Sequence, residues 1–590
     1  MTTASPSAAD RFNLAPGPYD FVPRLPVPAH THLHELDQAV ADVRANADAW
    51  TRATPERRLQ LLDEIAHATL AVAARWTELA SIHEGLDPTT QASAEEGIVG
   101  PYLFLRGVRL QRRAIADIAR GGKPRIPGGI RTLPGGRVAA RVMPSDFPDR
   151  LMYMGTTADV WMDASVTADN LPDTMAVNYA TPPPGRVCLV LGAGNASSIG
   201  PLDVVHKVFV ELQTVVLKMH PVMAHLTEVQ SAALAPLIRA GLVRVVSGDA
   251  IEGAHLAHHP GVDTLHVTGS DKTYDAIVFG TGPESAERRR LDQPVLDKPF
   301  TAELGNLTPI IVVPGRWSNK DLDYHAENIV TMLANNAGFN CTASRVIVLA
   351  RDWPQRAALM DRVRARFAAL PPRLAYYPGS QERFAAFQAA YPQAETFGSP
   401  GKGELPWMLI PGLSPDAVGD PAYRVEAFCA VTAETLIDAA DAATFLDKAT
   451  AFANERLWGT LNATVIVDPA TARSAATRPA LDRAIADLRY GTVSLNHWSS
   501  IGYGLGITPW GAHPGHPRND IGSGTGFVHN PLMFERVQKS VVRSWFRAWP
   551  HPMWFTDHTT SHLLVPHLIR YEVDRNPARL APIFWHALRG

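Results

Sequence analysis

Short, mostly apolar runs alternate with helical segments over residues 187–270, and this alternation restricts the chain to few folds. The runs are Val187–Leu191, Val215–Lys218, Leu242–Val246 and Thr264–Val267. Strands that are buried on both faces have this pattern. Strands that alternate with helices at such spacing form parallel α/β units. We therefore predict a doubly wound, nucleotide-binding α/β architecture.

A second α/β region begins near Pro299. Its expected elements are strands at Pro309–Val313 and Arg345–Leu349, a helix ending at Asn335 and a helix over Gln355–Leu370. At the other end of the chain, a helical pattern over Leu36–Leu86 follows an arm rich in Pro, Ala and Ser. The chain therefore has room for at least two packed domains.

Composition excludes several classes of function. Lysine and arginine number 55 against 58 aspartates and glutamates, so no basic surplus exists for a nucleic acid. We find no apolar stretch that could span a membrane and no secretion signal at the N-terminus. Three cysteines indicate a reducing compartment rather than a disulfide framework. A cytoplasmic protein is expected.

Only one of the three cysteines has a setting that suggests chemistry. Cys188 and Cys429 lie among apolar residues and read as buried fillers. Cys341 follows the turn-forming run 335–340 and precedes small residues, a loop setting in which a thiol is accessible and a thiolate could be nucleophilic.

Two other motifs in the sequence give weaker evidence of a binding site. The cluster Gly192–Gly194 lies at a strand–helix junction, but Ser197 stands where the dinucleotide fingerprint needs its third glycine, so a tight turn is the better interpretation. The histidines at 30, 32, 34, 255, 258 and 259 have neither HExxH spacing nor cysteine partners, so we predict no metal site.

A family resemblance emerges from six ordered segments. AELGNLTP (302–309) resembles the ELGGKSP signature of aldehyde dehydrogenases, and NNAGFNCTASR (335–345) resembles their NxGQxCxAxSR signature. VTGS (267–270), EAFCAV (426–431), YGTVSLN (490–496) and PWGAHPGH (509–516) resemble the FTGS, EIFGPV, GxVxN and PFGG segments. The match covers roughly residues 36–542. The chain thus resembles the aldehyde dehydrogenase superfamily, which depends on NAD or NADP and uses a cysteine nucleophile.

This resemblance implies a catalytic set. Cys341 stands at the nucleophile of the family and Glu303 at the general base that activates water. Asn195 precedes Lys218 by 23 residues, the separation that the family keeps between its oxyanion asparagine and its ribose-binding lysine. The implied reaction oxidises an aldehyde to a carboxylic acid through a cysteine thiohemiacetal and a thioester that water hydrolyses.

The resemblance also implies a cofactor site. Lys218 would hold the adenosine ribose, and Gly269 and Ser270 would open a helix facing the pyrophosphate. Glu426 would accept hydrogen bonds from the nicotinamide ribose, with Phe428 against the ring. Pro221 replaces the acidic residue of NAD-preferring members, so NADP should be tolerated, and His220 could approach a 2′-phosphate.

Several residues depart from the family pattern. Phe339 replaces the glutamine two positions before the nucleophile, Asn306 replaces the second glycine of ELGG, and FCA replaces FGP after Glu426. One alternative is a CoA-acylating aldehyde dehydrogenase or acyl-CoA reductase, although such relatives usually lack the Glu303 carboxylate. Another is a catalytically silent scaffold of the same fold.

The implied fold is aldehyde dehydrogenase-like: two parallel α/β domains, one Rossmann-type for the nucleotide and one catalytic, with an oligomerisation arm. We predict a homodimer or homotetramer, in which the arm adds a strand to the sheet of the neighbour. The predicted parts are an N-terminal arm (1–35), an NAD(P)-binding domain (36–299, with part of 131–173 in the oligomerisation element), a catalytic domain (300–511), the oligomerisation arm (512–543) and an extension (544–590).

The extension, which lies beyond the family pattern, contains four of the 13 tryptophans. A disordered tail is poor in aromatic residues, so we expect this one to be ordered. It could cover its own subunit, wall the substrate entrance or cross to a partner.

Overall fold

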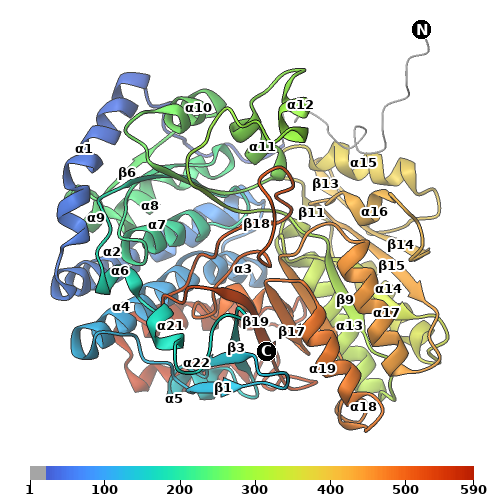
Figure 1. Cartoon of the computed structure of the whole chain (residues 1–590). Coiled ribbons are helices and arrows are strands. Elements are labelled where there is room, and N and C mark those ends of the chain that lie inside the picture. Colours follow the sequence, from blue (N-terminus) through green and yellow to red (C-terminus); the bar gives the residue numbers. More distant parts are fainter. Residues whose placement is uncertain (1–20) are drawn as a thin grey trace.

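Two β-sheets with helices packed around them form the protein, and a computed structural model describes residues 21–590 (Figure 1). Part of the predicted N-terminal arm lies outside the described residues. The helical region begins at α1 (Leu33–Thr51) and continues in α2 (Pro55–His83). Thr54 caps α2, because its side chain accepts from the backbone N–H of Arg57 and Pro55 needs no hydrogen-bond partner in the first turn.

The smaller sheet has six strands in the order β18-β8-β7-β4-β5-β6. Its strands are β4 (Val187–Leu191), β5 (Thr214–Lys218), β6 (Val243–Val246), β7 (Thr264–Thr268), β8 (Phe300–Glu303) and β18 (Gly524–Thr525). Strands β4 to β8 run parallel, and β18 pairs antiparallel with β8. The helices that accompany this sheet include α7 (Ile199–Phe209), α8 (Thr227–Ala233), α9 (Ala235–Arg239), α10 (Ala250–His258), α11 (Asp271–Phe279) and α12 (Ser285–Arg290). The predicted alternation of strands and helices is confirmed.

The larger sheet has 11 strands in the order β1-β2-β3-β19-β17-β16-β9-β10-β15-β14-β12. Its strands are β1 (Ile130–Thr132), β2 (Val138–Met143), β3 (Thr157–Met162), β9 (Thr308–Val312), β10 (Ser344–Ala350), β12 (Glu395–Phe397), β14 (Trp407–Leu413), β15 (Val431–Ile437), β16 (Asn462–Ile466), β17 (Thr492–Leu495) and β19 (Val537–Arg543). Helices α13 (Asn319–Ala334), α14 (Arg356–Ala369), α17 (Ala442–Glu455) and α19 (Arg478–Asp487) lie beside its parallel part (Figure 1). The two α/β units of an aldehyde dehydrogenase-like fold are therefore present.

The predicted arm has a partner strand within its own chain: β19 pairs in parallel with β17 and antiparallel with β3. That the arm also adds a strand to the sheet of a neighbouring subunit stays a prediction. Pairing within one chain satisfies the edge of β17 without the loss of freedom that association requires. The arm thus completes its own catalytic sheet.

The chain passes from the smaller to the larger sheet between β8 and β9, in the segment 304–307. The predicted domain boundary at residue 299 precedes β8, which pairs with β7 in the smaller sheet. The domain ranges themselves stay predictions. This crossing places Glu303, the last residue of β8, at the junction of the two units.

The C-terminal extension is ordered and packs on its own chain. It forms α21 (Ser561–Asp574) and α22 (Leu580–Ala587). Leu564, Val565 and Leu568 pack with Tyr102 and Leu103 in one apolar cluster. This cluster joins the extension to α4 (Leu103–Gly121), so the extension covers part of its own subunit.

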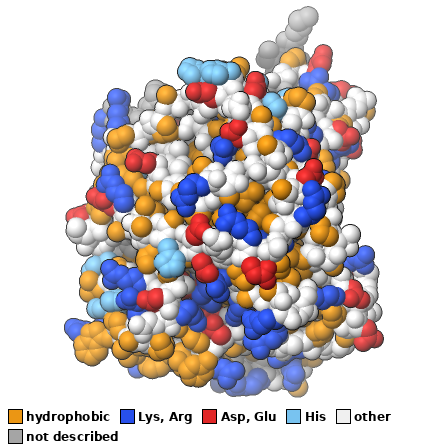
Figure 2. Space-filling model, turned by 90° about the vertical axis from the view of Figure 1, so that its left-hand side faces the viewer, with side chains coloured by type: hydrophobic (Ala, Val, Ile, Leu, Met, Phe, Trp, Pro, Cys, Tyr) orange, Lys and Arg blue, Asp and Glu red, His pale blue; other side chains and the backbone are white. Residues whose placement is uncertain are grey.

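The surface agrees with the near-neutral charge of the chain. On the face drawn in Figure 2, lysines and arginines are interspersed with acidic side chains. Among the described helices, none is long and apolar enough to cross a membrane.

Candidate functional site

Four of the predicted site residues lie at the carboxyl ends of parallel strands in the smaller sheet. Asn195 follows β4, Lys218 ends β5, Ser270 follows β7 and Glu303 ends β8. Strand β4 lies between β5 and β7, so the sheet is extended in opposite directions from it. Ligands of open α/β sheets bind in the crevice at such a switch point. The topology therefore brings these four residues to the same edge of the sheet, on the two sides of the switch point.

The loop carrying Cys341 has an unusual backbone. Asn336, Ala337 and Gly338 have φ values of 52°, 51° and 82°. A Cβ on Gly338 would lie 2.6 Å from the carbonyl oxygen of Cys429, so only glycine fits here. The Arg345 guanidinium donates to the carbonyls of Gly338 (2.5 Å) and Cys429 (2.6 Å), which fixes the loop against β15.

Hydrogen bonds also hold the carbonyl of Cys341. The Thr308 hydroxyl and the Asn462 amide each donate to it at 3.2 Å. Asn306 is fully buried and donates to the Thr308 hydroxyl (3.1 Å) and to the carbonyl of Asn462 (2.9 Å). The asparagine that replaces a family glycine thus braces the two side chains that position the nucleophile.

Asn195 reaches the same loop. Its side-chain Nδ2 donates to the carbonyl of Phe339 at 2.8 Å, and its own carbonyl accepts from Asn336 Nδ2 at 2.6 Å. A side-chain amide has two N–H donors, so the second hydrogen can serve an oxyanion. Phe339, which replaces the family glutamine, is fully buried, with its ring 4.9 Å from that of Tyr376.

Glu303 is buried beside the nucleophile. Burial raises the pKa of its carboxyl to about 8, and the negative charge of Asp203 adds to this rise. The Cys341 thiol and the Trp510 indole act on the carboxyl as hydrogen-bond donors and lower the pKa in part. Its Oε1 is buried without a hydrogen-bond partner, which leaves an acceptor for a reacting water.

The environment of Cys341 disfavours the thiolate in the resting protein. Burial raises the pKa of its thiol well above the usual value, and the charges of Glu303 and Glu426 raise it further. Its own backbone N–H opposes this rise. Cys341 is partly exposed, whereas Cys188 and Cys429 are fully buried, as fillers would be. Glu303 and Cys341 therefore lie close enough for each to shift the pKa of the other.

Glu426 lies on the other side of the nucleophile loop. A Cβ on Gly305 would come within 2.0 Å of Glu426 Oε2, so the carboxyl occupies the space that a side chain at position 305 would need. Burial raises the pKa of Glu426 to about 7, and its Oε1 is buried without a partner. Phe428 follows at φ 42°, with its ring 4.9 Å from that of Tyr377.

Comparison with known proteins agrees with this geometry. Residues 164–373 match the model of the aldehyde dehydrogenase family, and that range contains Asn195, Lys218, Ser270, Glu303 and Cys341. Over this range the chain is similar to the aldehyde dehydrogenase family, and its fold is aldehyde dehydrogenase-like. A curated aldehyde dehydrogenase of Enchytraeus buchholzi is 30% identical over 132 residues, which span 21% of this chain and 24% of that relative.

Solved structures show the same fold at low identity. An NAD-dependent aldehyde dehydrogenase from Sinorhizobium meliloti superposes with a TM-score of 0.57 at 21% identity, over 89% of each chain. An aldehyde dehydrogenase from Pseudomonas syringae, solved with NAD+ and octanal, gives a TM-score of 0.57 at 18% identity over 87% of this chain and 89% of its own.

The edge of the smaller sheet at the switch point has groups that fit a dinucleotide. The partnerless Glu426 Oε1 is a buried acceptor that suits a ribose hydroxyl. Ser270 caps α11 by accepting from the N–H of Thr273, and the start of a helix favours a phosphate. Lys272 and Arg383 lie near enough to this end for the charge of Arg383 to lower the pKa of Lys272. The sequence reading missed both basic residues, because neither belongs to a quoted motif.

The His220 side chain is partly buried and neutral. Its ring fills the space beside Gly194, where a Cβ would meet Nδ1 at 2.4 Å, and it stacks on Tyr377 at 6.1 Å. Burial lowers the pKa of His220 to about 4, and the charge of Lys218 lowers it further. A neutral imidazole adds no positive charge for a 2′-phosphate.

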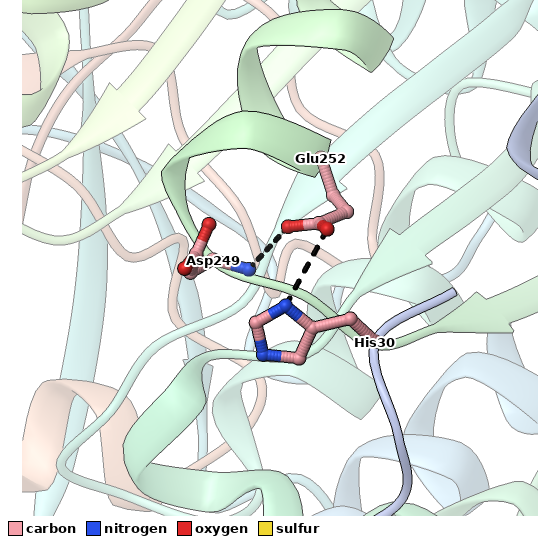
Figure 3. Close-up of side chains that lie close together, drawn as sticks. All are labelled: His30, Asp249 and Glu252. Carbon is pink, nitrogen blue, oxygen red and sulfur yellow. Dashed lines mark hydrogen bonds and ion pairs between the residues drawn. The ribbon is translucent and has the colours of Figure 1, made fainter. Parts of the chain in front are cut away.

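Two carboxylates instead lie near Lys218, and Figure 3 shows them with His30 at the start of α10. Burial lowers the pKa of Lys218, while Glu252 and Asp249 raise it. Glu252 Oε2 accepts from the backbone N–H of Asp249 at 2.8 Å, and Oε1 lies 3.4 Å from His30 Nδ1. Among residues 21–590 these three could meet at one metal ion by distance, but the Asp249–Glu252 contact is a helix cap. The expected absence of a metal stays a prediction.

Proposed function

We propose that this protein oxidises an aldehyde to a carboxylic acid, with NAD or NADP as the hydride acceptor. The observation that carries the proposal is the placement of Glu303 against Cys341, where each group shifts the pKa of the other. A nucleophile needs a base within reach, and here the base is a buried carboxyl with a raised pKa.

The first step forms a bond between sulfur and carbon. Ionised Glu303 takes the proton of the Cys341 thiol, and the sulfur attacks the carbonyl carbon of the aldehyde. The carbonyl π electrons move to oxygen, and the Asn195 amide and the Cys341 backbone N–H stabilise the negative charge there. Both donors are preorganised, because Asn195 is held by Phe339 and Asn336.

The second half-reaction releases the acid. A dinucleotide, when bound, would supply the hydride acceptor: as the C=O bond of the adduct re-forms, its carbon would lose a hydride and become the carbonyl carbon of a thioester on Cys341. Glu303 releases to solvent the proton that it took from the thiol. It then takes a proton from water, the resulting oxygen attacks the thioester carbon, and the carbon–sulfur bond breaks with its electron pair on sulfur. The partnerless Glu303 Oε1 is the acceptor for this water.

Residues of the crevice would hold the dinucleotide. Lys218 would contact the adenosine ribose, and Gly269, Ser270 and the start of α11 would face the pyrophosphate. Glu426 would accept from the nicotinamide ribose, and Phe428 would line the ring site. Pro221 supplies no carboxylate to exclude NADP, whereas Glu252 brings one near Lys218 from a different helix.

A turnover panel tests the proposal. Short, long-chain and aromatic aldehydes are offered with NAD or NADP, with and without CoA, and reduced nicotinamide is measured. We expect turnover without CoA. Turnover that requires CoA would favour the CoA-acylating alternative, and no turnover with any aldehyde would favour a scaffold. A homodimer or homotetramer stays a prediction, which sedimentation tests.

A further inference from the structure

A cavity of about 600 Å³ lies between the C-terminal extension, the region of α2 to α4 and the loop before Cys341. The extension contributes Met553, Trp554, Phe555 and Thr556 to its lining. No part of the family pattern covers these residues, which follow position 543. The cavity is therefore partly built from a segment that lies beyond the family pattern.

One end of the cavity lies at the nucleophile loop. Its lining includes Asn340, the residue before Cys341, and Trp498, whose indole donates to the carbonyl of Thr342 at 2.7 Å. Tyr503 also lines it, and both Tyr503 and Cys341 pack against the cluster of Leu461, Trp510 and Val528. The lining thus reaches the residues adjoining the reactive sulfur.

The wall made by the extension is fixed in place. The Trp554 ring lies 5.0 Å from that of His497, and the Phe555 ring lies 5.2 Å from that of Tyr324. The backbone N–H of Thr556 donates to the Thr331 hydroxyl at 3.1 Å, which ties the segment to α13. Phe555 is 2% exposed. These contacts make the extension a rigid side of the cavity rather than a loose cover.

The lining favours an apolar ligand. Aromatic and aliphatic side chains predominate, and Ile98 and Leu103 face the cavity together with Trp554 and Phe555. The charged residues of the lining are Glu84, Glu95, Arg373, Lys402 and Glu404. Among them, Arg373 lies 3.3 Å from Glu95 and 3.6 Å from Glu84, so these opposite charges are paired. A volume of this size lies in the range of ~300–1,000 Å³ that holds drug-sized molecules and far exceeds the needs of acetaldehyde.

We propose that the C-terminal extension forms a wall of the substrate site, and that Trp554 and Phe555 select aldehydes with a long or bulky apolar body. This inference rests on the proposed function. Burial of the apolar body against these rings stabilises the complex in proportion to the area covered.

Two variants with opposite effects on the cavity volume test the role of the wall. Trp554→Ala removes apolar contact, whereas Gly504→Leu fills the cavity, since a Cβ at Gly504 would meet only Ile501, at 3.8 Å. We expect each to lower kcat/KM for decanal about tenfold and to leave acetaldehyde turnover unchanged. Trp585→Ala is the matched control, because Trp585 lies in the same extension, 59% exposed and outside the cavity lining.

Binding of decanoic acid to the Cys341→Ala protein separates this inference from the proposed function. Saturable binding that Gly504→Leu abolishes would support the cavity even if no aldehyde were oxidised. Oxidation of decanal and acetaldehyde by all variants in the same ratio as by the unmodified protein would overturn the inference while the proposed function stands. Absence of decanoic acid binding would also overturn it.

Discussion

The Asn195 side-chain amide donates to the carbonyl oxygen of Phe339 at 2.8 Å, two residues before the nucleophile Cys341. Asn195 belongs to the smaller sheet and Phe339 to a loop of the larger one, so this bond links the two units at the reacting centre. A donor held in this way needs no rearrangement when charge develops on the aldehyde oxygen.

Replacing Asn195 by alanine should therefore lower kcat about 100-fold or more, the effect expected when one oxyanion donor is removed. Dinucleotide affinity should stay the same, because this amide faces the nucleophile loop. Steady-state kinetics and dinucleotide titration measure the two effects. An unchanged kcat would remove Asn195 from the oxyanion site.

Activity should rise with pH through about 8, the pKa to which burial raises the Glu303 carboxyl. Below that pH the carboxyl holds its proton and cannot accept one from the thiol or from water; above it, the ionised base is available. The pH profile of kcat/KM reports this group. In Glu303→Gln this rise should disappear. Loss of the Glu303 charge lowers the pKa of Cys341, so the thiol can lose its proton to solvent, whereas hydrolysis lacks its base and should slow. Reduced nicotinamide should therefore form in a burst. A flat profile in the unmodified protein, or unchanged steady-state turnover in the variant, would assign the base elsewhere.

Cofactor preference should respond to the carboxylate near Lys218. Glu252→Gln should raise kcat/KM with NADP relative to NAD, because a negative charge near the ribose opposes a 2′-phosphate. Pro221→Glu should shift the ratio toward NAD. Glu228→Gln offers a control at a different helix of the same domain. If Glu252→Gln leaves the ratio unchanged, Glu252 does not face the bound ribose.

Stability should depend on the ion pair that anchors the extension. Arg106 is fully buried, 3.0 Å from Asp149 and 3.4 Å from Glu572 of α21. Glu572→Ala removes one carboxylate from a buried arginine and should cost about 3 kcal/mol of unfolding free energy. Glu78→Ala breaks an exposed pair with Arg75 and should cost ~0.5 kcal/mol or less. Thermal unfolding measures the change in stability of each variant. Equal decreases in the unfolding temperature of the two variants would show that the buried pair contributes little.

The sequence predicts local elements well where one physical signal determines them. The strand at Val187–Leu191 was predicted with the observed bounds, because a continuous apolar run has few other uses in a parallel sheet. The site residues could be placed through their motifs. The pairing of β19 with β17 of its own chain could not be predicted, because the partner of a strand depends on long-range geometry. Arg383 and the cavity were missed for the same reason.

The proposed reaction passes through a covalent intermediate on Cys341, which mass spectrometry of the Glu303→Gln protein can detect. The variant is mixed with an aldehyde that the unmodified protein oxidises and with the dinucleotide, quenched in acid and digested. The account predicts that the peptide containing Cys341 gains the mass of the acyl group, while the peptides containing Cys188 and Cys429 do not. Formation of reduced nicotinamide with no acyl group on Cys341, together with full activity of Cys341→Ala, would contradict it.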